Sequence, residues 1–178
     1  MKVRTILTIA MAVALAVVGT IWIRSLVPPE SPTGSLAVLS AAPELPIYDR
    51  SGKKIDLADA KGRYLIVHFW ATWCPPCVEE IPALSRFWEK YGNRADLVLY
   101  AVSVDKDWKI IDNFATKNPN KIPIYRDPDA KTAARFGSSQ YPETYIVNPA
   151  GRVLYRVQGA MSWDDPEVRR KIEQLLAS

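Results

Sequence analysis

Residues 64–77 read YLIVHFWATWCPPC, and this stretch decides the fold. Residues 64–69 are apolar on both alternating faces except at His68, a pattern that predicts a central β-strand covered on both sides. The two cysteines then open a segment, residues 74–91, whose apolar residues recur at helical spacing and which is followed by Gly92, a residue type common just beyond a helix. The stretch therefore predicts a strand that leads through a short loop into a helix that begins at the cysteines.

The neighbouring segments extend this strand and helix into an α/β fold. Residues 96–104 form a second apolar run, and a strand, helix and strand in this order build a right-handed unit with parallel strands. Turn residues and helical periodicity predict further elements. These are a hairpin in which residues 47–48 and 55–57 flank a turn at residues 49–54, helices over residues 107–117, 129–136 and 166–177, and a second hairpin formed by residues 145–147 and 153–155. Asp107 and Asp165 are the predicted N-caps of the first and last of these helices. The expected architecture is a central mixed β-sheet flanked by helices, with an N-terminal β-hairpin extension.

An uninterrupted apolar run, residues 6–23, precedes this domain. At 1.5 Å per helical residue the run would reach about 27 Å, close to the hydrocarbon thickness of a bilayer. We therefore expect a single transmembrane signal anchor at residues 6–23, preceded by a basic cytoplasmic N-terminus at residues 1–5. Residues 24–42 are then a Pro- and Ser-rich tether, and residues 43–178 are a domain on the periplasmic side of a bacterial cytoplasmic membrane. A cleaved signal peptide is the alternative, and both interpretations export the domain.

Composition excludes several classes of function. Residues 43–178 contain 20 Lys and Arg against 18 Asp and Glu, without a basic stripe interleaved with aromatics, so nucleic-acid binding is disfavoured. Cys74 and Cys77 are the only cysteines and His68 is the only histidine, which leaves too few ligands for a zinc site. We expect no metal site, and thiol chemistry is confined to the cysteine pair.

Their spacing gives the two cysteines different expected roles. Cys74 opens the predicted helix, where unpaired amides and the helix dipole favour a thiolate, so it is the expected nucleophile. Cys77 lies one turn further in and is the expected resolving thiol, which attacks a mixed disulfide between Cys74 and a substrate. A purely structural disulfide is the alternative, but so short a loop constrains little of the unfolded chain. We therefore expect redox chemistry at this pair and no other cofactor.

Residues 68–77, HFWATWCPPC, together with Glu80 and Pro82, resemble the active-site segment of the thioredoxin-like TlpA/ResA/DsbE family. The resemblance implies a thioredoxin fold over residues 43–177 and the activity of a membrane-tethered or exported thiol:disulfide oxidoreductase. Members of the family reduce apocytochrome c before haem attachment or reduce copper-binding proteins of respiratory oxidases. The implied partners are therefore disulfide-bearing exported proteins and a membrane thiol donor of the DsbD/CcdA type.

The resemblance also implies a surface that binds the substrate. It places Tyr141-Pro142 in a cis-proline loop that faces the cysteines, and it adds Trp73 and Glu143 as further substrate-binding residues. An exposed backbone in this loop can pair with an extended substrate segment.

Two further ionisable residues have competing interpretations. Glu80 resembles the family's active-site acid and shares a helical face with Cys77, with which it could exchange a proton, but a solvent-facing acid is the alternative. His68 stands where thioredoxins have a buried aspartate. It is either a proton acceptor for Cys77 or a core histidine hydrogen-bonded to its surroundings.

The leading functional hypothesis is an exported reductase of protein disulfides. A thiol oxidant of the DsbA type uses the same chemistry but carries a helical insertion that this chain lacks. A Cu(I)-binding metallochaperone is the alternative from another class, because two thiolates suit Cu(I). A peroxidase of related fold needs a Pro-x-x-x-Thr-x-x-Cys loop, which the residues before Cys74 do not match.

Overall fold

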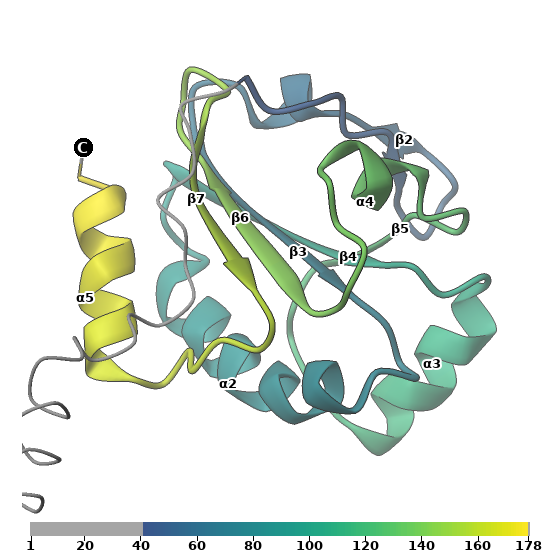
Figure 1. Ribbon diagram of the computed structural model, residues 1–178. Coiled ribbons are helices and arrows are strands. Elements are labelled where there is room, and N and C mark those ends of the chain that lie inside the picture. The colour runs from purple at the N-terminus through teal and green to yellow at the C-terminus, as the bar shows by residue number, and fades with distance from the viewer. Residues whose placement is uncertain (1–40, 178) are drawn as a thin grey trace, which may run out of the picture. The chain divides into compact units, whose positions relative to one another are not determined.

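The structure is a computed structural model that describes residues 41–177, in which one mixed seven-stranded sheet carries helices on both faces (Figure 1). Its elements in chain order are β1 (Ile47–Tyr48), β2 (Lys54–Ile55), the 3-10 helix η1 (Leu57–Ala60), β3 (Tyr64–Trp70), α2 (Pro75–Tyr91), β4 (Leu97–Ser103), α3 (Trp108–Lys117), β5 (Ile124–Arg126), α4 (Lys131–Arg135), β6 (Glu143–Val147), β7 (Val153–Gln158) and α5 (Pro166–Leu175). The strand order is β2-β1-β5-β4-β3-β6-β7.

Strand β3 lies in the interior of the sheet, between β4 and β6. All seven of its residues are buried, as the apolar pattern of both faces predicts. It pairs in parallel with β4, and antiparallel with β6 through the partners His68 and Thr144. The predicted unit of strand, helix and parallel strand is therefore confirmed.

The helices form two layers around this sheet. On one face, Trp70 of β3 packs against Phe114 of α3, with ring centroids 5.3 Å apart, and α2 lies beside α3 (Figure 1). On the other face, Phe69 of the same strand packs against Phe136 at the end of α4. Successive residues of a strand point to opposite faces, so β3 contributes to both halves of the core.

Most predicted elements are confirmed, with three differences. The hairpin pairs Ile47 with Ile55, and α3 and α5 begin after the predicted caps Asp107 and Asp165. Strand β5 was not expected, because three half-buried residues that follow a proline give too short a pattern to recognise. Helix α4 is shorter than the predicted 129–136, since Ala130 adopts a left-handed conformation before it. Leu57, expected in the hairpin, instead opens η1.

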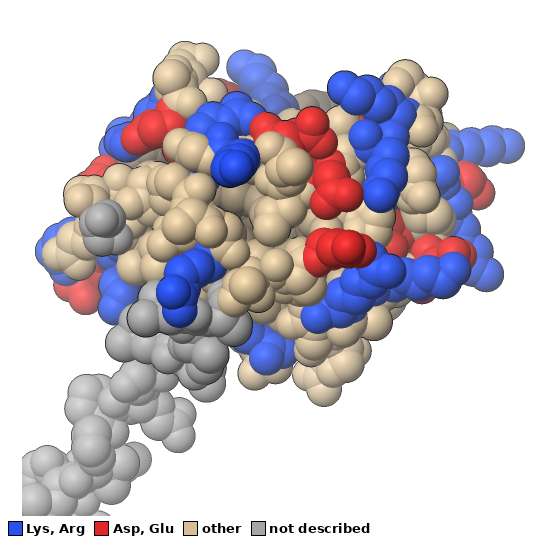
Figure 2. Space-filling model, turned by 90° about the horizontal axis from the view of Figure 1, so that it is seen from above, with Lys and Arg blue, Asp and Glu red and all other residues tan. Residues whose placement is uncertain are grey.

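The expectations for residues 1–5 and 6–23 and for most of the tether lie outside the described residues. Within residues 41–177, no helix combines the length and the apolar composition that crossing a membrane requires. On the face that Figure 2 displays, acidic and basic side chains alternate rather than gathering by sign, which agrees with the near-neutral composition of the domain.

Candidate functional site

The two cysteines form a disulfide at the start of helix α2. Cys74 is the N-cap residue, and the Cys77 N–H group donates a hydrogen bond of 3.4 Å to its sulfur. The prolines between them occupy the first helical positions, where no intrahelical amide is needed. Cys77 is fully buried whereas Cys74 is 5 % exposed, so a substrate can reach only the sulfur of Cys74.

Trp73 and the Tyr141-Pro142 loop surround Cys74. The Tyr141-Pro142 peptide bond is cis, as the resemblance implies, and the Tyr141 carbonyl oxygen lies 3.4 Å from the Cys74 sulfur. The Trp73 side chain is 65 % exposed and meets the Tyr141 ring edge to face, with centroids 6.1 Å apart. Burial raises the pKa of the Tyr141 hydroxyl above its ordinary 10.0, further from physiological pH, at which the side chain is neutral. Together they form an exposed aromatic ledge beside the disulfide.

Glu80 and His68 lie together in the core. The His68 ring is fully buried, and its Nε2 atom lies 3.1 Å from Oε1 of Glu80. Its Nδ1 atom lies 3.0 Å from the Thr144 hydroxyl, and Oε2 of Glu80 accepts a hydrogen bond of 2.7 Å from the Met161 N–H group. A solvent-facing position for Glu80 is therefore wrong. The sequence could not reveal this burial, because it depends on the segment after β7, which folds over this part of α2.

Glu143 directly follows the cis-proline but faces away from His68, because adjacent residues of β6 point to opposite faces. Its side chain is 2 % exposed and accepts a hydrogen bond from Nε of Arg156 on β7. Arg156 also donates to the Gly137 carbonyl at 3.0 Å and lies over the Tyr145 ring. The structure thus gives the buried Glu143 a half-buried counter-charge, Arg156, that sequence reasoning missed.

A second missed residue organises the loop before the cysteines. Asp105, after β4, is buried and accepts hydrogen bonds from the N–H group and the hydroxyl of Thr72, at 2.9 and 2.8 Å, and from the Ser103 hydroxyl at 2.7 Å. Four residues of loop separate β3 from α2, and this carboxylate fixes the second of them. The sequence offered one indication of this role, which is the position of Asp105 just beyond a buried strand and level with the end of β3.

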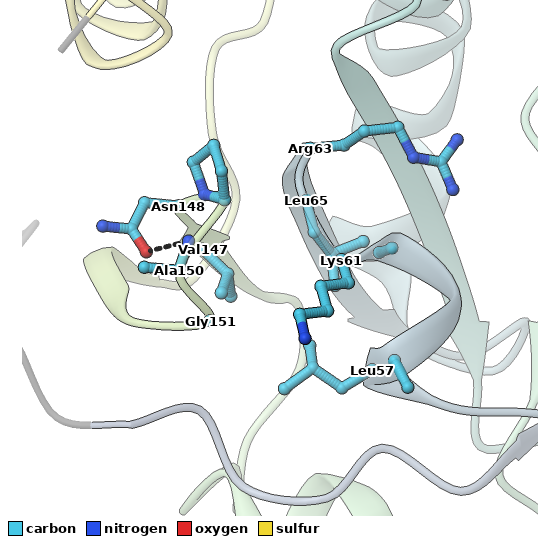
Figure 3. A pocket seen from close by; sticks show the side chains of 11 residues that line it. Leu57, Lys61, Arg63, Leu65, Val147, Asn148, Ala150 and Gly151 are labelled. Atoms are coloured by element: carbon cyan, nitrogen blue, oxygen red, sulfur yellow. Dashed lines mark hydrogen bonds between the residues drawn. The ribbon is translucent and has the colours of Figure 1, made fainter.

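A pocket of about 230 Å³ lies away from the cysteines. Leu57 and Lys61 line one wall, Leu65 lies at the start of β3, and Asn148 and Gly151 belong to the turn between β6 and β7 (Figure 3). The disulfide follows the opposite end of β3, roughly 20 Å away along a seven-residue strand. The pocket is therefore not part of the cysteine site. Within residues 41–177, no group of three His, Cys, Asp or Glu side chains is placed to hold a metal ion.

Comparison with known proteins places this geometry among thiol-disulfide oxidoreductases. The AhpC/TSA family profile matches residues 38–156. The chain is 30 % identical over 128 residues to the thiol-disulfide oxidoreductase ResA of Bacillus subtilis, covering 72 % of this chain and 71 % of that protein. It is 31 % identical over 133 residues to the thioredoxin-like protein YneN of the same organism, covering 74 % and 78 %.

A solved structure agrees with these relatives. A Chlorobium tepidum protein provisionally named thiol:disulfide interchange protein DsbE superposes with a TM-score of 0.70 at 25 % identity, covering 80 % of this chain and 99 % of that one. The expected thioredoxin-like α/β fold is therefore confirmed for the described residues.

Proposed function

The chain belongs to the AhpC/TSA family of thioredoxin-like proteins, and on this premise we propose that it is an exported thiol:disulfide oxidoreductase that reduces disulfides in partner proteins. The observation that carries the proposal is the disulfide itself. It joins the fully buried Cys77 to Cys74, which keeps 5 % of its surface exposed and lies beside an exposed aromatic ledge.

The reduced cysteine pair would act in two steps. The Cys74 thiolate attacks one sulfur of the partner's disulfide, so that a mixed disulfide forms and the other partner sulfur leaves as a thiolate. Cys77 then loses its proton and attacks the Cys74 sulfur, which closes the internal disulfide and releases the second partner thiolate. Two electrons pass from the cysteine pair to the partner, and no cofactor other than the cysteine pair takes part.

The aromatic ledge and Glu80 have separate roles in this proposal. Trp73, Tyr141 and Pro142 bind the extended segment around the partner's cysteine. Glu80 accepts the proton of Cys77 in the second step, because the two residues lie three positions apart on one face of α2. Glu143, paired as it is with Arg156, supports the strand behind the cis-proline loop rather than offering a free charge to the partner.

The cellular setting of the proposal rests on the sequence. Residues 6–23 would anchor the chain in the bacterial cytoplasmic membrane and place the domain on the periplasmic side. A membrane thiol donor of the DsbD/CcdA type would return electrons to the Cys74–Cys77 disulfide. Apocytochrome c and copper-site proteins, the clients implied by the resemblance, are the proposed partners.

A trapping experiment tests the proposal. A Cys77→Ala variant of the full-length protein, produced in its host, should accumulate mixed disulfides through Cys74, and mass spectrometry of these adducts identifies the partners. The matched Cys74→Ala variant keeps one thiol but lacks the accessible sulfur, so it should trap far less. Equal trapping by both variants would overturn the assignment of Cys74 as nucleophile.

The direction of electron flow needs a separate measurement. A reductase needs a reduction potential well below the ~ −120 mV of DsbA, because a potential near that value marks an oxidant. Stoichiometric copper that survives dialysis of the reduced protein and is lost in the Cys74→Ser variant would instead favour a metallochaperone.

A further inference from the structure

A chain of buried polar contacts links the cis-proline strand to the active-site helix. It runs from the Thr144 hydroxyl to Nδ1 of His68, at 3.0 Å, and from Nε2 of His68 to Oε1 of Glu80, at 3.1 Å. The other oxygen of Glu80 accepts the Met161 N–H group. Each member of this chain is at least nine-tenths buried.

The two oxygens of Glu80 are not equivalent. Oε2 is occupied by the 2.7 Å hydrogen bond from Met161. Oε1 lies close to His68, but the ring N–H is not aligned with it, and no described residue donates a hydrogen bond to Oε1. A buried acceptor without an aligned donor is rare and calls for an explanation. Oε1 is the one oxygen of this carboxylate with free capacity to take a proton.

The Glu80 carboxylate is held from two sides, by the Met161 N–H group at Oε2 and by the His68 ring, whose Nε2 atom lies 3.1 Å from Oε1. The other groups that face the pair carry no charge: Thr144 from β6, Ala101 opposite His68 on β4, and the Trp163 ring, which meets the His68 ring edge to face.

Charged side chains on the neighbouring described elements pair with one another. Glu143 of β6 and Arg156 of β7 lie on the other face of the sheet, where they form an ion pair. Asp164, next to Trp163, is already shared between Arg86 and Arg169.

We infer that His68 is a positioning residue for the resolving step. Held by Thr144, it fixes the position of the Glu80 carboxylate and directs Oε1 to receive the proton of Cys77. As the proton passes from the Cys77 sulfur to Oε1, the Cys77–Cys74 bond forms, and the bond from Cys74 to the substrate sulfur breaks with release of a thiolate. The inference rests on the proposed role of Glu80 in disulfide exchange, and it accounts for a histidine inside an otherwise apolar strand.

The test separates the two steps with a chromogenic disulfide. Reduced full-length protein mixed with excess 5,5′-dithiobis(2-nitrobenzoate) releases one coloured thiolate when Cys74 attacks and a second when Cys77 resolves the adduct. In His68→Asn the first phase should be unchanged, which also reports an intact fold. The second should slow about 10²-fold near pH 7, the size typical of a lost general base.

The pH profile distinguishes positioning from a general structural effect. The deficit of His68→Asn should shrink as the pH rises, because a growing fraction of Cys77 is then ionised before it attacks and needs no base. Glu80→Gln should show the same profile, and the double variant should be no slower than either single variant, because both act on one proton transfer. Thr144→Val, a smaller change, should slow the second phase a few-fold in the wild-type background and not at all in Glu80→Gln.

Three results would overturn the inference. These are an unchanged second phase in His68→Asn, a deficit of equal size at every pH, and losses that multiply in the double variant. The assay uses a small disulfide and no partner protein. Its outcome is therefore independent of whether the protein reduces exported proteins in the cell.

Discussion

Removal of the Arg156 side chain should destabilise the domain strongly. Arg156→Ala leaves the Glu143 carboxylate, 2 % exposed, without its counter-charge, and it also removes the hydrogen bond to the Gly137 carbonyl. Loss of one partner of a buried ion pair costs roughly 3–5 kcal/mol. The Arg156 side chain is 29 % exposed, so water reaches part of the pair and we expect the lower end, about 3 kcal/mol. For a domain of this size that corresponds to a fall of about 10 °C in melting temperature.

The measurement is urea and thermal unfolding of the oxidised full-length protein in mild detergent, followed by circular dichroism. Arg135→Ala is the matched control, because its ion pair with Glu44 is exposed and should contribute less than about 1 kcal/mol. In Glu143→Gln/Arg156→Ala no charge is left buried, so the double variant should be more stable than Arg156→Ala alone. A loss below 1 kcal/mol in Arg156→Ala, or a double variant that sums the single losses, would refute this reasoning.

Three further predictions concern the site and the core. Trp73→Ala should change the free energy of unfolding by less than about 0.5 kcal/mol, since the side chain is mostly exposed, yet should slow reduction of a protein disulfide while alkylation of Cys74 keeps its rate. Asp105→Ala leaves the half-buried Thr72 N–H group and hydroxyl and the buried Ser103 hydroxyl without their acceptor, and it should cost about 2–3 kcal/mol in urea unfolding. Burial raises the pKa of Tyr100 from its ordinary 10.0 to about 12. The unfolded state therefore loses this proton first. Tyr100 should contribute about 2 kcal/mol to the fall in stability as the pH rises from 10 to 12, and Tyr100→Phe should remove that contribution in alkaline unfolding curves.

The parts of the fold that depend on local pattern were predictable from the sequence. The apolar period of β3, the cysteines at the start of α2 and the caps of α3 and α5 each act within a few residues. Strand β5 depends instead on its parallel pairing with β4, which begins at Ala101 opposite Ile124. Three residues carry too little pattern to reveal such a pairing by themselves.

The residues of the candidate site also fall into those that the sequence could identify and those that depend on contacts between distant segments. Cys74 and Cys77 follow from their spacing, and Tyr141 and Pro142 came from the family resemblance. The partners of His68 could not be inferred, because Thr144 lies 76 residues away in sequence and becomes a neighbour only through the register of β3 and β6. Arg156 likewise reaches Glu143 only across the pairing of β6 with β7. Sequence reasoning thus located the reacting sulfurs and the ionisable residues near them, but not the partners that hold those residues in place.

The exposed position of Trp73 has an optical consequence. Trp73 precedes Cys74 in the chain and its side chain is exposed, whereas Trp70 and Trp163 are fully buried. A disulfide accepts an electron from an excited indole beside it and so quenches the emission, whereas a pair of thiols does this poorly. Reduction of the Cys74–Cys77 bond should therefore brighten the long-wavelength emission that a solvent-exposed tryptophan gives. The oxidation state of the protein can then be followed by its own fluorescence, without a dye or a coupled enzyme.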